Sequence, residues 1–477
     1  MQSIKAIILI GGPNKGQRFR PLSFDSPKYM FPVGGQTILG HLIDRCLDLV
    51  VAGKNLDLIE ILILGFYQQS GADYLSQSNL QKLVEEKLRN IRKLSDRHDS
   101  KVLIRYLQEF TRMGTAGGLY HFRDQIRRGN PDAFLLINGD VCGDFDFSQM
   151  LARHRETTLI IEKEGESMST KKPMITVMTT EASRSESQSY GCIVENVKHH
   201  HVIEHYVEKP STFVSNLINC GAYVCSLELL NLIEDVMRTK APNLMQDELD
   251  SSQTILRSSN DASFTSSTST SDYLSLELDI LQQRNFQPHC YSYRTSGSWW
   301  CQVKTAASAI YANRQYLEHN RVKLANDRSP RESVHNCTII GNVYIHPTAS
   351  VDPSSVIGPN VSIMENCIVG PGVRIKDSII LQSAVIEPHS LVMCSILGWN
   401  CMIGSWTRVE GTPGEPDPNQ KYAKVQNPPL FNPNGKLNPS ITVLGSNVKI
   451  SRGIVILNTI VLPHKELGRS YKNEIVL

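Results

Sequence analysis

The first 149 residues alternate between short apolar runs and longer segments with apolar residues at every third or fourth position. The short runs predict strands at 6–10, 59–64, 102–107 and 134–137, and the longer segments predict helices at 38–51 and 80–94. This alternation is typical of a parallel sheet covered by helices on both faces. Because ligands of such sheets bind at the carboxyl ends of strands, the loops after 6–10 and 134–137 are expected at one edge.

The pattern becomes less regular after residue 162. Residues 164–172 are polar, and we expect them to form a surface loop. Residues 251–271 consist mainly of serine, threonine and other polar residues with little apolar surface to bury, which predicts disorder. Neither segment is expected to carry the core function.

The last third of the chain contains a six-residue repeat. Every sixth residue from Val343 to Val409 is apolar except Ser355, and the positions two residues further on are apolar from Ile345 to Leu381. With turns rich in glycine, proline and asparagine, this period indicates a left-handed parallel β-helix in which three hexads make one triangular coil. Solenoids of this kind often mediate assembly, so we expect self-association.

Residues 411–439 interrupt the repeat with a segment rich in proline and asparagine. We interpret this segment as a loop that projects from the solenoid and contacts a partner, and a connection without a partner is the alternative. Together these patterns predict two domains, an α/β domain at 1–325 and a β-helix domain at 335–477.

Composition excludes several classes of function. The 477 residues are 40% hydrophobic and 20% charged, and their net charge of +2 provides no field suited to nucleic acid or a membrane surface. The eleven cysteines are scattered without zinc-ligand spacing, which favours reduced thiols in a cytosolic protein. With no apolar run near the roughly twenty residues of a membrane span, we expect a cytoplasmic protein.

The loop after the first predicted strand, GGPNKGQRFRPLSFDSPK, has the composition of a phosphate site. Gly11 and Gly12 let the backbone approach a phosphate, and Arg18 and Lys28 supply positive charge. Taken alone, the loop is also compatible with an ordinary surface turn. Motifs elsewhere in the chain favour the phosphate site.

The loop resembles the GG-x-GTRL-x-PLT loop and following PKPM motif of the nucleotidyltransferases that make sugar nucleotides. The resemblance extends to Gly114-Thr115-Ala116-Gly117, Asn138-Gly139-Asp140, Tyr190-Gly191, Val207-Glu208-Lys209-Pro210 and Asn219-Cys220-Gly221. With the hexad repeat it covers almost the whole chain. Within the family, the chain is most similar to the mannose-1-phosphate guanylyltransferases, and among these to the alpha, regulatory subunit of animals.

The resemblance implies a Rossmann-like domain and a reaction in which a sugar 1-phosphate attacks the α-phosphorus of a nucleoside triphosphate and expels pyrophosphate. It implies that Arg18 steadies the leaving phosphates and that Lys28 and Lys209 hold phosphate oxygens. It further implies that Glu208 and Asn219 bind sugar hydroxyls. The positions expected to bind substrate are Gly11, Gly12, Arg18, Lys28, Gly114, Asp140, Gly191, Glu208, Lys209 and Asn219.

The chain departs from the family at the positions for metal and triphosphate. The family holds Mg²⁺ with two aspartates, one at the position of Asp140 and one in a late motif where this chain has Gln302. Since magnesium prefers carboxylates, Mg²⁺ is expected to bind weakly through Asp140 alone. In the first loop, Pro13 removes a donor N–H and two extra residues precede Gly16. These departures predict reduced turnover.

Together with these departures, the resemblance implies a regulatory subunit that binds GDP-mannose and mediates feedback inhibition of a catalytic beta-subunit paralogue. The β-helix and the 411–439 loop are the expected contacts with that partner. Two rival hypotheses stay open: an active guanylyltransferase, and an acyltransferase that uses His346, His389 or His464 as its base. The alternatives without a functional role are that Asp140 is only a helix cap or turn residue and that 208–210 form a solvated turn.

Overall fold

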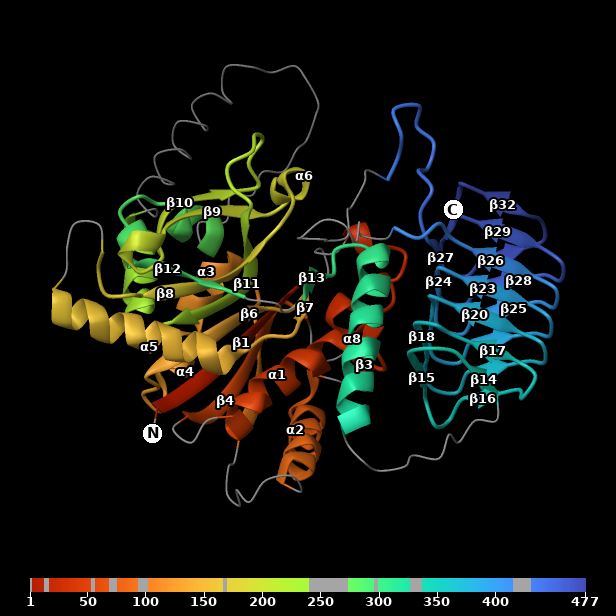
Figure 1. Ribbon diagram of the computed structural model, residues 1–477, viewed down its shortest axis with the longest axis horizontal. Coiled ribbons are helices and arrows are strands. Elements are labelled where there is room, and N and C mark those ends of the chain that lie inside the picture. The colour runs from red at the N-terminus through yellow and green to blue at the C-terminus, as the bar shows by residue number, and fades with distance from the viewer. Residues whose placement is uncertain are drawn as a thin grey trace. The chain divides into compact units, whose positions relative to one another are not determined.

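The computed structural model describes residues 2–12, 17–52, 56–67, 75–92, 102–165, 170–239, 273–295, 299–326, 337–414 and 430–477. Pro13, Gly16 and the segment 251–271 therefore lie outside the described residues, as does most of the 411–439 loop. The chain divides into two compact units (Figure 1). Unit 1 comprises Met1–Gly12, Ile43–Gly139 and Phe145–Gly297, and unit 2 comprises Pro13–Leu42, Asp140–Asp144 and Ser298–Leu477.

A nine-stranded sheet with the order β5-β4-β1-β6-β11-β8-β12-β10-β9 forms the centre of unit 1 (Figure 1). Its first part is parallel, as the alternating pattern predicts, and consists of β1 (Gln2–Gly11), β4 (Leu56–Gly65), β5 (Leu103–Gln108) and β6 (Ala133–Asn138). The rest is mainly antiparallel and consists of β8 (Ile175–Glu181), β9 (Gly191–Asn196), β10 (Val202–Glu208), β11 (Leu217–Cys225) and β12 (Cys290–Arg294).

Apolar side chains from the sheet and its helices form the core of unit 1. Ile7 and Phe134 of the sheet are fully buried together with Leu119 of α3 and Ile126 of α4. Helices of the chain before residue 200 include α1 (Ile38–Ala52), α2 (Gln77–Arg92), α3 (Gly114–His121), α4 (Arg123–Arg127), α5 (Phe147–Glu164) and α6 (Arg184–Ser187). The predicted helices at 38–51 and 80–94 correspond to α1 and α2.

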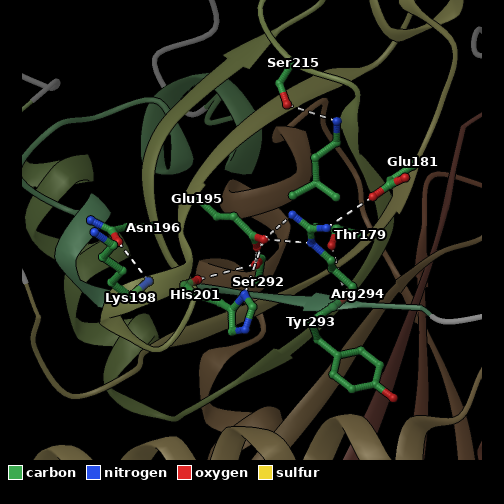
Figure 2. Close-up of polar contacts among 11 residues, drawn as sticks. Thr179, Glu181, Glu195, Asn196, Lys198, His201, Ser215, Ser292, Tyr293 and Arg294 are labelled. Atoms are coloured by element: carbon green, nitrogen blue, oxygen red, sulfur yellow. Dashed lines mark hydrogen bonds and ion pairs between the residues drawn. The ribbon is translucent and has the colours of Figure 1, made fainter.

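A carboxylate links the strands of the antiparallel part (Figure 2). Glu195 on β9, whose side chain is 3% exposed, accepts hydrogen bonds from Arg294 and Ser292 on β12. Arg294 Nη1 also lies 3.2 Å from Glu181 Oε1 on β8, and His201 Nδ1 lies 3.3 Å from Glu195 Oε1. Because a buried carboxylate is stable only when its oxygens are paired, these contacts hold the three strands in register.

Three parallel sheets in unit 2 form the predicted parallel β-helix (Figure 1). One contains β14 (Thr338–Ile339), β17 (Val356–Ile357), β20 (Arg374–Lys376), β23 (Leu391–Met393), β26 (Arg408–Glu410), β29 (Val455–Leu457) and β32 (Tyr471–Lys472). The second contains β15 (Val343–Ile345), β18 (Val361–Ile363), β21 (Ile379–Ile380), β24 (Ser395–Leu397), β27 (Thr442–Leu444), β30 (Ile460–Val461) and β33 (Ile475–Val476). The third contains β16 (Ser350–Val351), β19 (Ile368–Val369), β22 (Val385–Ile386), β25 (Met402–Ile403), β28 (Lys449–Ile450) and β31 (Glu466–Leu467).

The coils depart from the strict six-residue step of the sequence pattern. Val343 pairs with Val361, 18 residues on, whereas Ser362 pairs with Ile379, only 17 residues on. The step of six is therefore wrong in the middle of the repeat, because one turn of the coils there is a residue shorter. As a result Val385 and Leu391 are only partly buried, and the core is filled there by Ala384, Ile386 and Val392.

A second core in unit 2 joins the first loop and α8 (Ala306–Asn326) to one face of the β-helix. Phe19 and Phe31 of the loop are buried with Tyr316 of α8 and with β-helix residues such as Ile379 and Ile396. The loop forms two 3₁₀ turns and two short strands, η1 (Gln17–Phe19), η2 (Lys28–Met30), β2 (Pro32–Val33) and β3 (Gln36–Thr37). The segment that carries Arg18 and Lys28 is thus packed on the β-helix.

None of the helices in the described part of the chain is both long enough and apolar enough to span a membrane. All eleven cysteines are described, and each is a free thiol. Burial raises the pKa of the Cys401 thiol to about 12, which keeps it protonated and unreactive.

Candidate functional site

The first loop begins at the end of β1. Gly11 has a φ of +68°, a left-handed conformation that glycine adopts without strain. A Cβ at Gly12 would lie 3.0 Å from the Cβ of Phe66, so a larger residue there would displace that side chain. Further along, Arg18 on η1 is exposed. Its position suits contact with a solvated anion.

Asp140 lies at the centre of a polar contact within unit 2. The Lys28 Nζ is 2.7 Å from Asp140 Oδ2, and the Gln302 amide donates from Nε2 to Asp140 Oδ1 at 3.0 Å. Two short strands place these groups, because β7 (Val141–Gly143) pairs antiparallel with β13 (Trp300–Gln302) and the N–H of Val303 donates to the Asp140 carbonyl at 2.8 Å. Both carboxylate oxygens therefore accept a hydrogen bond from the chain.

Electrostatics keep Asp140 ionised. Burial by itself would raise the pKa of this carboxyl group, but the ammonium of Lys28, the amide of Gln302 and the charge of Lys304 together lower it below its usual value. The side chains of Lys28 and Asp140 are only 18% and 23% exposed, so water screens their attraction weakly. Lys28 acts as the counterion of Asp140.

These residues do not fit a magnesium site. Magnesium takes oxygen ligands, usually one or two carboxylates, and retains several waters. Here the carboxylate of Asp140 faces an ammonium and an NH₂ group, and Gln302 offers an amide rather than a carboxylate. Within the described residues, no group of three or more histidine, cysteine, aspartate or glutamate side chains is placed to hold a metal ion.

The Gly-Thr-Ala-Gly motif lies at the start of α3 in unit 1. Gly114 has a φ of +75°, and a Cβ there would come within 2.4 Å of the Leu274 carbonyl oxygen. That oxygen accepts hydrogen bonds from the N–H groups of Ala116 and Gly117 at 3.0 and 3.2 Å. The chain itself thus satisfies donors at this helix start, and Gly114 is required for the close approach.

Glu208, Lys209, Asn219 and Gly191 come together in a second cluster of unit 1. Lys209 Nζ lies 2.7 Å from Glu208 Oε1, and the Tyr206 hydroxyl donates to Glu208 Oε2 at 2.8 Å. Gly191 pairs directly opposite Glu208, and a Cβ there would come within 2.1 Å of the Tyr206 hydroxyl oxygen. Only glycine at this position leaves room for the two side chains.

Sequence motifs missed two tyrosines of this second cluster and, at the Gly-Thr-Ala-Gly motif, Glu277. Tyr206 and Tyr223 are 2% and 1% exposed, and both accept hydrogen bonds from the Asn219 amide. Glu277 accepts from the hydroxyl of Thr115 at 3.1 Å. Tyr206 stands two residues before Glu208 and therefore on the same strand face, which is the one signal that the sequence contained. Glu277 follows a long polar segment and had no such signal.

The histidines considered for acyl transfer lie at separate turns of the β-helix. His389 stacks on Trp406 with a centroid separation of 4.5 Å, and His346 contacts the hydroxyl of Thr348 at 2.9 Å. The backbone N–H of His464 donates to the Ser446 carbonyl at 2.8 Å. The side-chain contacts of His346 and His389 are those of turn residues.

Comparisons with known proteins cover both units. Residues 5–319 match the family described as "Nucleotidyl transferase", and residues 339–476 match "GMPPB C-terminal domain". The chain is 44% identical to "Mannose-1-phosphate guanyltransferase alpha-A" of Xenopus laevis over 480 residues, covering 99% of this chain and 100% of the relative. It is 44% identical over 474 residues to the rat protein and 43% identical over 481 residues to the Drosophila melanogaster protein, both named "Mannose-1-phosphate guanylyltransferase regulatory subunit alpha", with the same coverage.

Proposed function

We propose that this chain, which belongs to the mannose-1-phosphate guanylyltransferase family of nucleotidyl transferases, is a regulatory subunit. In this proposal it binds GDP-mannose and inhibits a catalytic paralogue, so that the supply of GDP-mannose for glycosylation is limited by the product. The names of the relatives support the regulatory part, and the contacts at Asp140 support the loss of catalysis.

The observation that carries the proposal is the pairing of Asp140 with Lys28 and Gln302. Transfer of a nucleotidyl group depends on neutralising the charge of the phosphates while the reacting atoms are held in line. A carboxylate that already forms an ion pair at 2.7 Å and accepts an amide hydrogen bond at 3.0 Å is a poor metal ligand. We infer weak magnesium binding and slow turnover.

Product binding is supported by the second cluster. Glu208 forms an ion pair with Lys209 and accepts a hydrogen bond from Tyr206, and Gly191 leaves room for the side chains of Tyr206 and Glu208. A carboxylate of this kind accepts hydrogen bonds from sugar hydroxyls, and a lysine ammonium binds phosphate oxygens. The second cluster by itself therefore offers groups that suit the sugar and phosphate of a nucleotide sugar.

Packing in unit 2 suggests how a ligand is coupled to a partner. The first loop shares a core with Ile441 and Val443, which directly follow the 411–439 loop, and Asp25 accepts a hydrogen bond from the hydroxyl of Ser446. A ligand that draws Lys28 toward its phosphates acts on this shared core. We propose that the β-helix and the 411–439 loop contact the catalytic paralogue. The ligand then controls the complex to the extent that it binds one arrangement of the two subunits more tightly than the other.

A reducing compartment suits the chain. Ten of the eleven free cysteines are buried and one is partly buried, and disulfides are rare where thiols are kept reduced. We propose that the protein acts in the cytoplasm.

Pyrophosphate release is the direct test. The purified full chain is incubated with GTP, mannose 1-phosphate and Mg²⁺, with the catalytic paralogue assayed in parallel. We expect no turnover by this chain alone, and slower turnover by the paralogue when this chain and GDP-mannose are added. Turnover on the order of 1 s⁻¹ by the chain alone would identify it as an active guanylyltransferase.

Calorimetry identifies the ligand. We expect binding of GDP-mannose and weaker binding of UDP-glucose and ADP-glucose. Equal affinity for all three would remove GDP-mannose as the specific effector. Consumption of acetyl-coenzyme A, measured on the same preparation, tests the acyltransferase alternative.

A further inference from the structure

A chain of four hydrogen bonds and one ion pair ends on the carboxylate of Glu208. The Asn219 amide is oriented by the backbone, because the N–H of Gly221 can only donate and lies 2.8 Å from Asn219 Oδ1. The NH₂ group of Asn219 must then face the hydroxyls of Tyr206 at 3.1 Å and Tyr223 at 2.9 Å. Both amide hydrogens of Asn219 are therefore committed inside the protein.

The direction of the next bond follows. The Tyr206 oxygen accepts from Asn219, so its own proton is directed to Glu208 Oε2 at 2.8 Å. The other oxygen of Glu208 receives Lys209 Nζ at 2.7 Å. Tyr206 is 2% exposed and the Glu208 side chain 18% exposed, so the carboxylate faces the solvent side while the tyrosine supports it from within.

The backbone is built to produce this arrangement. Between Asn219 and Tyr223 the pairing of β11 with β8 shifts register, a bulge that redirects side chains. Gly221 within the bulge has a φ of +75°, and a Cβ there would come within 2.7 Å of Asn138 Nδ2. A regular strand would keep the backbones of residues four apart about 13 Å from each other, whereas the bulge lets the Asn219 amide reach the Tyr223 hydroxyl at 2.9 Å and the Tyr206 hydroxyl at 3.1 Å.

We propose that Tyr206 is the positioning residue of the sugar site and that Asn219 acts through it rather than by donating its NH₂ group to the ligand. This inference rests on the proposed binding of GDP-mannose. Each oxygen of Glu208 keeps a lone pair beyond the bonds that it already accepts. Glu208 is then the acceptor for the sugar hydroxyls, and its orientation is set by Tyr206 on one oxygen and by Lys209 on the other.

Tyr206→Phe tests the assignment because it removes a single hydroxyl. We expect GDP-mannose to bind about tenfold more weakly to this variant in calorimetry, the effect of losing a hydrogen bond to a charged group, while the affinity for GDP stays unchanged. Tyr291→Phe is the matched control, since Tyr291 is 1% exposed on β12 of the same sheet and its hydroxyl donates to the Lys171 carbonyl at 2.8 Å. The control should bind both ligands like the wild type.

A double-mutant cycle shows whether Tyr206 acts through Glu208. If it does, adding Tyr206→Phe to Glu208→Ala should weaken GDP-mannose binding less than twofold beyond Glu208→Ala alone. Asn219→Asp is a second variant that still accepts the Gly221 N–H but donates nothing to Tyr206, and it should weaken GDP-mannose binding selectively. Thermal melts establish that each variant is folded.

Three results would overturn the inference. Unchanged GDP-mannose affinity in Tyr206→Phe would show that its hydroxyl does not position the site. Equal weakening of GDP-mannose and GDP would show a general structural role. Additive losses in the cycle would show that Tyr206 does not act through Glu208. Failure of the wild-type chain to bind GDP-mannose would instead refute the proposed function, a separate result that removes the basis of this inference as well.

Discussion

Gln302→Asp restores a second carboxylate beside Asp140 and should make the stability of the protein depend on magnesium. The substitution removes the hydrogen bond from Gln302 Nε2 to Asp140 Oδ1, and a bond to a charged group contributes about 1.5–3 kcal/mol. It also places two carboxylates about 4 Å apart, where an effective dielectric constant of about 20 gives a repulsion of about 4 kcal/mol before the attraction of Lys28 offsets part of it.

The expected change in the stability of the variant therefore depends on whether Mg²⁺ is present. Without Mg²⁺ the variant should unfold at a lower temperature than the wild type, because the repulsion between carboxylates is uncompensated. Mg²⁺ at tenfold its dissociation constant stabilises the folded variant by about 1.4 kcal/mol and should recover part of the loss. The wild type, whose Asp140 is engaged by Lys28 and Gln302, should show little magnesium dependence.

Thermal unfolding at increasing Mg²⁺ concentration is the assay, and the double variant Asp140→Asn with Gln302→Asp is its control. The control has one carboxylate again, so its response to magnesium should return to that of the wild type. If Gln302→Asp alone gains no magnesium-dependent stability, the identity of residue 302 is not what weakens the metal site, and the argument for lost catalysis from this position fails.

Three further predictions concern stability. Glu60→Gln leaves the ammonium of Lys5, whose side chain is 2% exposed, without its 2.7 Å counterion, and should cost about 3–5 kcal/mol in denaturant unfolding. Burial by itself would raise the folded-state pKa of Glu60, but the hydrogen bonds that its carboxylate accepts from Arg105 and Lys5 lower it. The contribution of Glu60 to stability is therefore present above the unfolded pKa of about 4.3 and is lost as pH falls through the folded value, and Glu60→Gln should lose less stability over that range. Burial lowers the pKa of His154 from 6.5 to about 4, so the unfolded chain binds the extra proton and wild-type stability should fall between pH 6.5 and 4; an unchanged slope in His154→Gln would contradict this. Asn313→Ala removes the acceptor of the buried Gly34 N–H at 2.8 Å and should destabilise the protein by about 1–3 kcal/mol, as measured by urea unfolding.

Much of the architecture could be read from local patterns. The parallel strands of unit 1 and the coils of unit 2 are specified by periods of apolar residues, which record which side of each element is buried. The shorter turns of the β-helix could not be read in this way. A strand such as β22 has apolar residues on both faces, Val385 and Ile386, so a shift of one residue leaves the hydrophobic pattern almost intact.

The candidate site could likewise be predicted only in part from the sequence. Motifs identified Lys28, Asp140, Glu208 and Asn219 because short spacings with glycine carry a recognisable signature. They did not show that Lys28 and Gln302 occupy both oxygens of Asp140, since these three residues are distant in sequence. The roles expected of the individual residues stay predictions until ligand binding is measured.

The sequence alone determined the family and the two kinds of fold, because each is written in residue identity or in a local period, and it predicted that Gln302 stands where the family has a metal-binding aspartate. Only the tertiary structure decided what the remaining groups bind to. Asn219 gives its hydrogens to two buried tyrosines, and Asp140 pairs with Lys28 across 112 positions of chain. Hydrogen bonds depend on distances of a few tenths of an ångström, and these are set by strand pairing and bulges rather than by the order of residues.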